Sequence, residues 1–216
     1  MYFNLHTHRS SGEVNVVELV NQYPDEFDVS AGYFSIGIHP WRISGERLDA
    51  DLEMIESKLS DKKCLAVGEC GLDKRIETPI DVQIPVFKAQ LDLAVKYRKP
   101  VVLHCVAAYQ EAIEIKKEFG ISVPMIIHGF SKNEQVAKQL LDAGFYLSFG
   151  KYLLRNPELE NVFKLVPDDR FFLETDMIDE TIQEVYSLAA RYKDKSIEQL
   201  KYTINKNVNA AFSLKL

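Results

Sequence analysis

Two histidines, His6 and His8, stand two residues apart in residues 4–10 (NLHTHRS) of a chain that has five histidines in all. Alternate side chains of a β-strand point to the same face, so a strand here would project both imidazoles together. Two imidazoles on one face can hold one metal ion. An H-x-H pair also occurs in loops without any such role, so the rest of the chain has to decide.

The other three histidines each close a short apolar run. His39 ends YFSIGIHP, His104 ends KPVVLHC and His128 ends VPMIIH, while Glu69 and Asp176 close CLAVGE and FFLETD. A charge at the end of a buried strand is costly unless it is paired or bound to a metal. The shared placement therefore predicts a site whose residues come from strands far apart in the sequence.

Each of these residues also has a structural alternative. His39 precedes Pro40 and could be a hydrogen-bonded turn residue, and Glu69 could cap the next element. Asp176 could be the N-cap of the helix that follows it. Glu174 is interpreted as structural, and the cysteines next to site residues are expected to pack in the core: Cys70 and Cys105.

The combination of imidazole and carboxylate groups limits which metal ions the site could bind. These groups disfavour Ca²⁺, which prefers all-oxygen ligands, and leave Zn²⁺, Mn²⁺, Mg²⁺, iron and Ni²⁺ as candidates. One catalytic zinc usually takes three protein ligands. The candidates here are enough for two divalent ions that share a carboxylate such as Glu69, and two ions can activate water and stabilise a displaced ester.

Composition limits the class of protein. The chain has 216 residues, 46% of them hydrophobic, without a linker-like stretch, so we expect one domain over residues 1–216. A net charge of −6 argues against a broad nucleic-acid-binding surface. Three cysteines without framework spacing, and no signal-like or membrane-spanning run, predict a reduced cytoplasmic protein with no membrane contact.

Helical and strand patterns alternate along the chain. Apolar residues recur at helical spacing in residues 47–59, 80–98, 109–119, 132–143, 179–192 and 196–212, with Ser131 as a possible cap of the fourth segment. Short β-branched runs lie between them, and four valines in residues 14–20 favour a further strand. Eight strands with intervening helices predict an α/β fold, the (β/α)8 TIM barrel, in a short version with reduced early helices.

The ordered set of these motifs resembles the TatD-related metal-dependent hydrolases of the amidohydrolase-like superfamily. The matching stretches are NLHTH, SIGIHPW, AVGECGLD, FKAQLDLAVKYRKPVVLHC, IIHGFS and FLETD, and INKNVNAAF resembles the closing helix of the family. The resemblance covers nearly the whole chain. It implies a TIM barrel and metal-dependent deoxyribonuclease activity.

The resemblance also implies roles for single residues. One metal would be held by His6, His8, Glu69 and Asp176, and the second by Glu69, His104 and His128. Asp176 would also orient or deprotonate the attacking water, which makes Asp176 and Glu69 the expected catalytic residues. His39 and Asp73 would lie beside the substrate.

The sequence departs from the family pattern at several places. Asn4 stands where an Asp usually precedes the two histidines, which would tune the metal differently. Val106 stands where many members carry an Arg that helps to hold a phosphate. After Asp176 the usual Pro- and Arg-containing loop is absent, and the chain is shorter than the ~250 residues typical of such barrels.

Three functions follow as hypotheses. The first is a TatD-type DNase that acts on DNA ends. Its candidate phosphate contacts follow strand ends and could equally be solvated surface charges: Lys74, Arg75, Lys151 and Arg155. The second is hydrolysis of a small phosphoester, ester, amide or lactone on the same metal centre. The third is a metal-binding barrel without catalysis. None of them requires an obligate protein partner.

Overall fold

The computed structural model describes residues 1–216. Its eight strands belong to one sheet in chain order: β1 (Tyr2–Thr7), β2 (Val16–Gln22), β3 (Phe34–Ile36), β4 (Cys64–Asp73), β5 (Val101–Val106), β6 (Met125–Ile127), β7 (Tyr146–Phe149) and β8 (Phe171–Leu173). No helix separates β1 from β2, and only the 3-10 turn η1 (Pro24–Glu26) follows β2. The predicted shortening of the first two β/α units is therefore confirmed.

By contacts the chain divides into two compact units, residues 20–126 and residues 1–19 with 127–216. A single domain over residues 1–216 stays a prediction.

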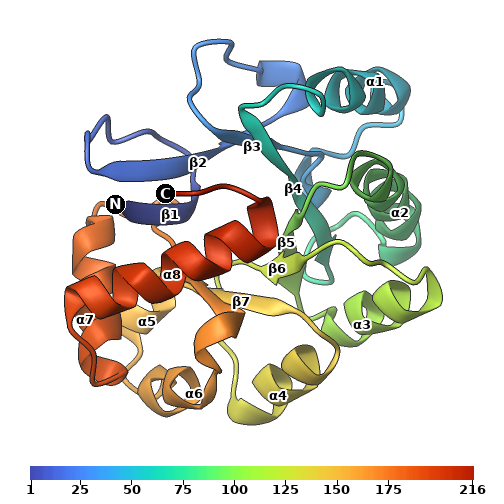
Figure 1. The fold of residues 1–216 in the computed structure, drawn as a ribbon. Coiled ribbons are helices and arrows are strands. Elements are labelled where there is room, and N and C mark those ends of the chain that lie inside the picture. Colours follow the sequence, from blue (N-terminus) through green and yellow to red (C-terminus); the bar gives the residue numbers. More distant parts are fainter. The chain divides into compact units, whose positions relative to one another are not determined.

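In the unit of residues 20–126, strands β2 to β5 pair in parallel. Helices α1 (Leu48–Lys58), α2 (Ile80–Tyr97) and α3 (Tyr109–Glu118) follow β3, β4 and β5, and α2 packs against β4 (Figure 1). The buried face of α2 includes Val86, Phe87 and Leu91 at helical spacing, so hydrophobic burial holds the helix on the sheet. Arg98, the residue that follows the helix, adopts the left-handed conformation of a C-cap.

The other unit contains five helices: α4 (Glu134–Asp142), α5 (Lys151–Arg155), α6 (Leu159–Leu165), α7 (Ile182–Tyr192) and α8 (Ile197–Phe212). Helix α8, which is red in Figure 1, contacts α7, β1 and β8. The rings of Phe3, Phe172 and Phe212 form the apolar contact, with centroids 5.8–6.3 Å apart. The buried hydroxyl of Tyr186 accepts from the N–H of Phe3 and donates to its carbonyl oxygen, which fixes β1 to α7.

Two helix caps that the sequence left open are formed by other residues. The N-cap of α4 is Asn133, whose side chain accepts a hydrogen bond from the N–H of Val136, and not Ser131. Asp176 does not cap α7, because Thr181 does so in a capping box with Glu184. In both cases the residue that caps the helix is the one directly before its first turn, where its side chain reaches the free N–H groups.

Helices α5 and α6 were not expected from the sequence. They have five and seven residues and are separated by Pro157. Segments this short carry little periodic signal and are stabilised by packing instead. Leu153, Leu159, Val162 and Phe163 supply the buried contacts.

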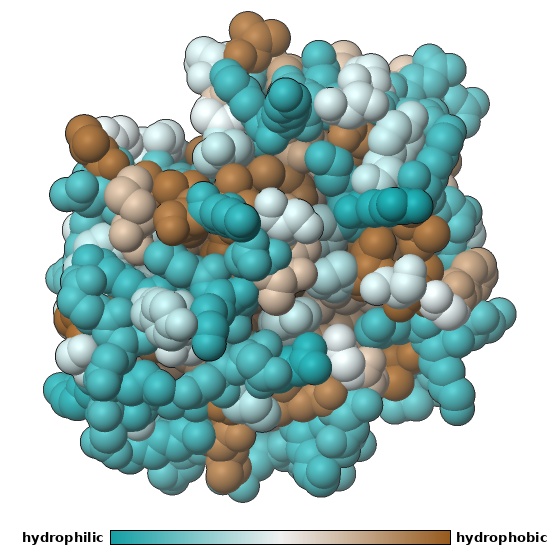
Figure 2. All heavy atoms as spheres, in the orientation of Figure 1, coloured by the Kyte–Doolittle hydropathy of each residue, from teal (hydrophilic) through white to brown (hydrophobic).

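The surface carries mostly polar side chains. Figure 2 shows hydrophilic residues over most of the visible face, with apolar residues in separate small groups. None of the helices is both long and apolar enough to cross a lipid bilayer. Among the large apolar side chains that remain exposed is Trp41, at 67%.

Candidate metal centre

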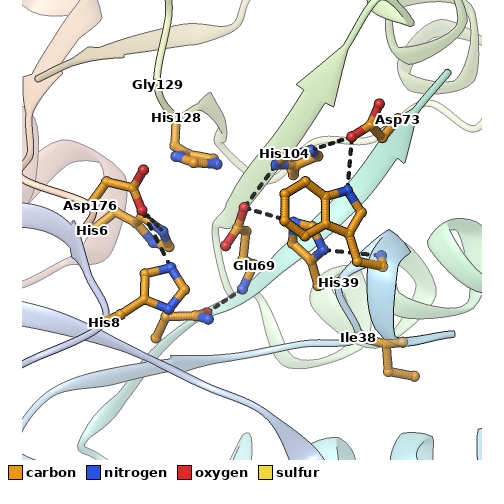
Figure 3. A network of polar contacts seen from close by, with 12 residues as sticks. His6, His8, Ile38, His39, Glu69, Asp73, His104, His128, Gly129 and Asp176 are labelled. Carbon is orange, nitrogen blue, oxygen red and sulfur yellow. Dashed lines mark hydrogen bonds and ion pairs between the residues drawn. The ribbon is translucent and has the colours of Figure 1, made fainter. Parts of the chain in front are cut away.

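In the unit that contains β1 and β8, His6 and His8 converge on Asp176 (Figure 3). The Asp176 N–H donates to the carbonyl oxygen of His6 at 2.8 Å, and the His8 N–H donates to the carbonyl oxygen of Asp176 at 3.3 Å. These backbone bonds and a parallel bridge between Thr7 and Asp176 place all three side chains together. We call His6, His8 and Asp176 the Asp176 cluster.

The distances in the Asp176 cluster fit a shared cation. The Nε2 atoms of His6 and His8 lie 3.7 and 3.4 Å from Oδ1 of Asp176, longer than an ordinary hydrogen bond. Ligand atoms that surround one Zn²⁺ ion at ~2.1 Å in a tetrahedron lie about 3.4 Å apart. The donor set, two imidazoles and one carboxylate, is also one that catalytic zinc sites use.

Asp176 itself has a backbone conformation that few residues adopt. Its φ of 57° lies in the left-handed region, which Asp and Asn tolerate better than most residues. Asn4 braces the preceding residue: its amide donates to Oγ1 of Thr175 at 2.8 Å and accepts from the Thr175 N–H at 3.0 Å. Asn4 thus holds the segment that carries Asp176.

His128 lies next to the same cluster. Its ring centroid is 4.4 Å from that of His6. Oε1 of Glu174 lies 3.4 Å from Nδ1 of His128 and accepts from the N–H of Gly129 at 2.7 Å. Glu174 is 1% exposed, so this buried carboxylate has a role beside His128 that its sequence position alone did not indicate.

In the unit of residues 20–126, Glu69 joins His39 and His104. Oε1 of Glu69 lies 2.9 Å from Nδ1 of His104 and 3.1 Å from Nε2 of His39 (Figure 3). We call these three residues the Glu69 cluster. Cys64–Asp73 extends four residues beyond Glu69, so Glu69 does not end its strand as expected.

A local irregularity directs Glu69. The pairing of β4 with β5 shifts register between Val67 and Cys70, and a bulge of this kind changes the direction of a side chain. Gly68 has a φ of 138°, and a Cβ there would lie 2.4 Å from the carbonyl oxygen of Val102. Asn21 completes the arrangement, because its side-chain oxygen accepts from the Glu69 N–H at 2.7 Å.

The hydrogen bonds of His39 define its proton position. Nδ1 accepts a bond from the backbone N–H of Trp41 at 3.1 Å, so the proton of the neutral ring is on Nε2. Nε2 therefore donates to Glu69. A ring nitrogen that carries a proton cannot bind a metal, so His39 acts as a donor rather than a ligand in this state.

Asp73 lies within hydrogen-bond distance of His104. Its Oδ2 is 3.2 Å from Nε2 of His104 and accepts from the indole N–H of Trp41 at 2.9 Å, while Oδ1 accepts from the N–H of Arg75. Burial by itself would raise the pKa of Asp73, but the bonds from Trp41, Arg75 and His104 lower it below its usual value. A carboxylate behind a histidine orients the ring and leaves the other nitrogen, Nδ1, for a metal.

Two buried amides on α2 support this arrangement. Gln83 accepts from the N–H of Asp73 and donates to its carbonyl oxygen, and Gln90 does the same for Ile38, next to His39. Neither glutamine was expected from the sequence to support the site. Their signal was present: two amides seven residues apart on the apolar face of an amphipathic helix have to bond to something buried.

Lys74, an expected substrate contact, lies outside the two clusters. Lys74 is 39% exposed and forms an ion pair with Glu111.

Cys70 and Cys105 are buried free thiols, as predicted, and burial raises the pKa of Cys105 to about 12. A thiol that stays protonated is a poor metal ligand.

A pocket of about 250 Å³ opens beside the Asp176 cluster. His8, Asp176 and Met177 line one part of it, and Arg9 contributes the one arginine. The rest of the lining is rich in carboxylates: Glu13, Glu18, Asp179 and Glu180.

Comparisons with known proteins identify relatives over most of the chain. Residues 3–213 match the family described as TatD related DNase. The metal-dependent hydrolase YabD of Bacillus subtilis, named as uncharacterized, is 34% identical over 67% of this chain and 58% of its own length, so the match spans less than two thirds of that relative. A 3'-5' ssDNA/RNA exonuclease TatD of Edwardsiella piscicida is 28% identical over 92% of this chain and 82% of its own.

Solved structures share the fold. YjjV, a TatD homolog from Escherichia coli, superimposes with a TM-score of 0.84 at 20% identity over 99% of this chain and 98% of its own. A TatD family hydrolase from Entamoeba histolytica gives a TM-score of 0.77 at 17% identity, over 99% and 98% of the two chains. With the parallel strands in chain order, this likeness confirms the predicted TIM-barrel fold.

Proposed function

The chain belongs to the TatD-related DNase family, and on that premise we propose that it hydrolyses phosphodiester bonds of nucleic acid with the help of divalent metal ions. The observation that carries the proposal is the Asp176 cluster. Its two imidazoles lie 3.4 and 3.7 Å from one carboxylate oxygen, a spacing that suits ligands of one ion. The names of the curated relatives, a metal-dependent hydrolase and an exonuclease, support the same reading.

We propose two ions, because two donor sets are present. His6, His8 and Asp176 would hold one ion, and Glu69 and His104 would hold the other together with His128. Glu69 as a ligand of both ions, as the family resemblance implies, is part of this proposal. When bound, the ions would polarise the phosphate and lower the pKa of a water molecule.

The protein's own residues supply the remaining steps. Asp176 is partly exposed and would accept the proton of the attacking water. The Nε2–H group of His39 would donate to a phosphate oxygen of the substrate in place of its present bond to Glu69. Asp73 and Glu174 would keep the rings of His104 and His128 in position.

Lys74 remains a proposed phosphate contact. In the absence of substrate its ammonium group is paired with Glu111, so a phosphate would have to compete with that carboxylate. Arg155 is similarly paired with Glu180. Location in the cytoplasm and independence from an obligate partner also stay predictions.

The test is hydrolysis of 3′-labelled single-stranded DNA with added Mn²⁺, Mg²⁺ or Zn²⁺. We expect cleavage by the wild type and none by Glu69→Ala, whose metal content should also fall. Glu198→Ala serves as the control, because Glu198 is an exposed residue of α8 paired with Lys201. Unchanged activity of Glu69→Ala would contradict the two-ion proposal.

One observation favours a second candidate, hydrolysis of a small phosphoester, ester, amide or lactone. The pocket beside Asp176 has several carboxylates and a single arginine, which is unfavourable for a polyanion. Val106 also offers no cation at the end of β5. Turnover of small esters without cleavage of any oligonucleotide would establish this alternative.

A further inference from the structure

Trp41 combines two properties that rarely occur together. Its side chain is 67% exposed, yet its indole N–H donates at 2.9 Å to Asp73, which is 2% exposed. The backbone N–H of Trp41 is also engaged, by Nδ1 of His39 at 3.1 Å. An exposed aromatic ring normally samples several rotamers, but a bond to a buried carboxylate restricts this one to a single orientation.

The ring stands at the edge of the Glu69 cluster. The centroid of its ring lies 5.0 Å from that of His39 and 5.9 Å from that of His104, with the ring planes at 81° and 73°. Neither imidazole stacks flat on the indole. Trp41 is therefore an exposed aromatic residue next to the histidine that would donate to the phosphate.

We propose that Trp41 is a platform on which one unpaired nucleobase of the substrate stacks while the neighbouring phosphate lies at the Glu69 cluster. This inference rests on the proposed function and adds a substrate-binding residue to it. Every base has a flat π-face, so an aromatic side chain holds single-stranded nucleic acid without sequence preference. A base inside a duplex has both faces covered, so single strands and frayed ends are the substrates that gain this contact.

Stacking also compensates for the scarcity of cations. The chain carries a net charge of −6, and Lys74, the expected phosphate contact, is occupied by Glu111. Affinity that comes from base stacking needs no positive charge and is less sensitive to salt than phosphate contacts are. A small phosphoester without an aromatic group would gain nothing from Trp41.

The alternative is a purely positioning role, in which the indole N–H of Trp41 only holds Asp73 beside His104. Two variants separate the roles. Trp41→Phe keeps a flat aromatic face but loses the N–H, whereas Trp41→Leu loses both. A platform predicts that only Trp41→Leu weakens substrate binding, while a positioning role predicts that both variants are impaired alike.

Trp41 is the only tryptophan of the chain, so the intrinsic fluorescence of the protein reports on this ring alone. We would mix the metal-loaded wild type with a thymidine oligonucleotide in a stopped-flow instrument and record the emission before cleavage. A strand of equal length with abasic deoxyribose units is the matched control. We expect saturable quenching by the thymidine strand and little by the abasic strand.

Binding of a labelled strand, measured by anisotropy, completes the test. Trp41→Leu should bind the thymidine strand about five- to 150-fold more weakly, with little change for the abasic strand. Trp41→Phe should stay within a few-fold of the wild type. Tyr202→Leu, which alters an exposed aromatic residue on α8, should bind as the wild type does.

The outcomes separate this inference from the proposed function. Quenching without hydrolysis of any nucleic acid would support the platform and contradict the nuclease proposal. Hydrolysis without quenching, or an equal loss of affinity for both strands in Trp41→Leu, would overturn the platform and leave the nuclease proposal in place. Absence of both quenching and binding would overturn the platform.

Discussion

The ring of His39 accepts a hydrogen bond on Nδ1 from the backbone N–H of Trp41, and this contact makes its Nε2 a donor. The two residues are only two positions apart, at the start of the 3-10 turn η2 (Pro40–Arg42). In the Glu69 cluster, His39 is thus the histidine whose Nε2–H group donates to Glu69.

A donor that is not a ligand gives a clear prediction for His39→Ala. Loss of the Nε2–H group should lower kcat/KM by about 10²-fold, the usual effect of removing one donor to a developing negative charge. The metal content, measured by elemental analysis, should stay at the wild-type value. His104→Ala is the comparison, because it should lose metal as well as activity; loss of metal in His39→Ala would show that His39 is a ligand after all.

Asp73→Asn should change metal affinity without removing a ligand. The amide is isosteric but cannot orient the Nε2–H of His104 as a carboxylate does. Losing such a carboxylate usually lowers metal affinity about 10–100-fold. Competition with a chelator measures the effect. Equal metal affinity in Asp73→Asn and the wild type would contradict the orienting role and favour direct contact of Asp73 with the substrate.

Gly68→Ala should destabilise the fold by at least ~2 kcal/mol. Its φ of 138° disfavours any side chain, and the added Cβ would meet the backbone of Val102 at 2.4 Å, where little can move. Urea unfolding followed by circular dichroism measures the change. Gly45→Ala is the matched control, since nothing lies within 4 Å of the Cβ position there, and a similar loss in both variants would refute the packing argument.

Tyr186→Phe should lower the free energy of unfolding by about 1–3 kcal/mol, because it leaves buried polar groups of Phe3 without the Tyr186 hydroxyl. Burial also raises the pKa of this hydroxyl, so it stays protonated and able to donate at ordinary pH. Chemical denaturation provides the measurement, with Tyr202→Phe as the exposed control. Equal stabilities of the two variants would show that β1 does not depend on this bond.

Much of the fold could be predicted from local patterns. Helical spacing located α2, α3, α4, α7 and α8 to within a few residues, and the run of valines correctly indicated strand β2 (Val16–Gln22). Apolar periodicity is a local property, so it can be read without knowledge of the packing. The same holds for the alternation of His6 and His8, which the structure brings together with Asp176.

The details of the site depended on contacts between residues distant in the sequence. Asn21 and Glu69 are 48 positions apart, and Trp41 and Asp73 are 32 apart, yet their hydrogen bonds direct the carboxylate and the indole. The contact between Glu174 and His128 also joins residues that are distant in the sequence.

The sequence by itself determined which residues could do chemistry and that they stand at or near strand ends, with Glu69 inside β4 as the exception. Residue type and local periodicity are enough for that. Only the tertiary structure decided that Asp73 lies 3.2 Å from His104 and that the Glu69 N–H donates to Asn21. Hydrogen-bond roles depend on distances of about 3 Å, and folding sets these through the packing of segments that no local pattern connects.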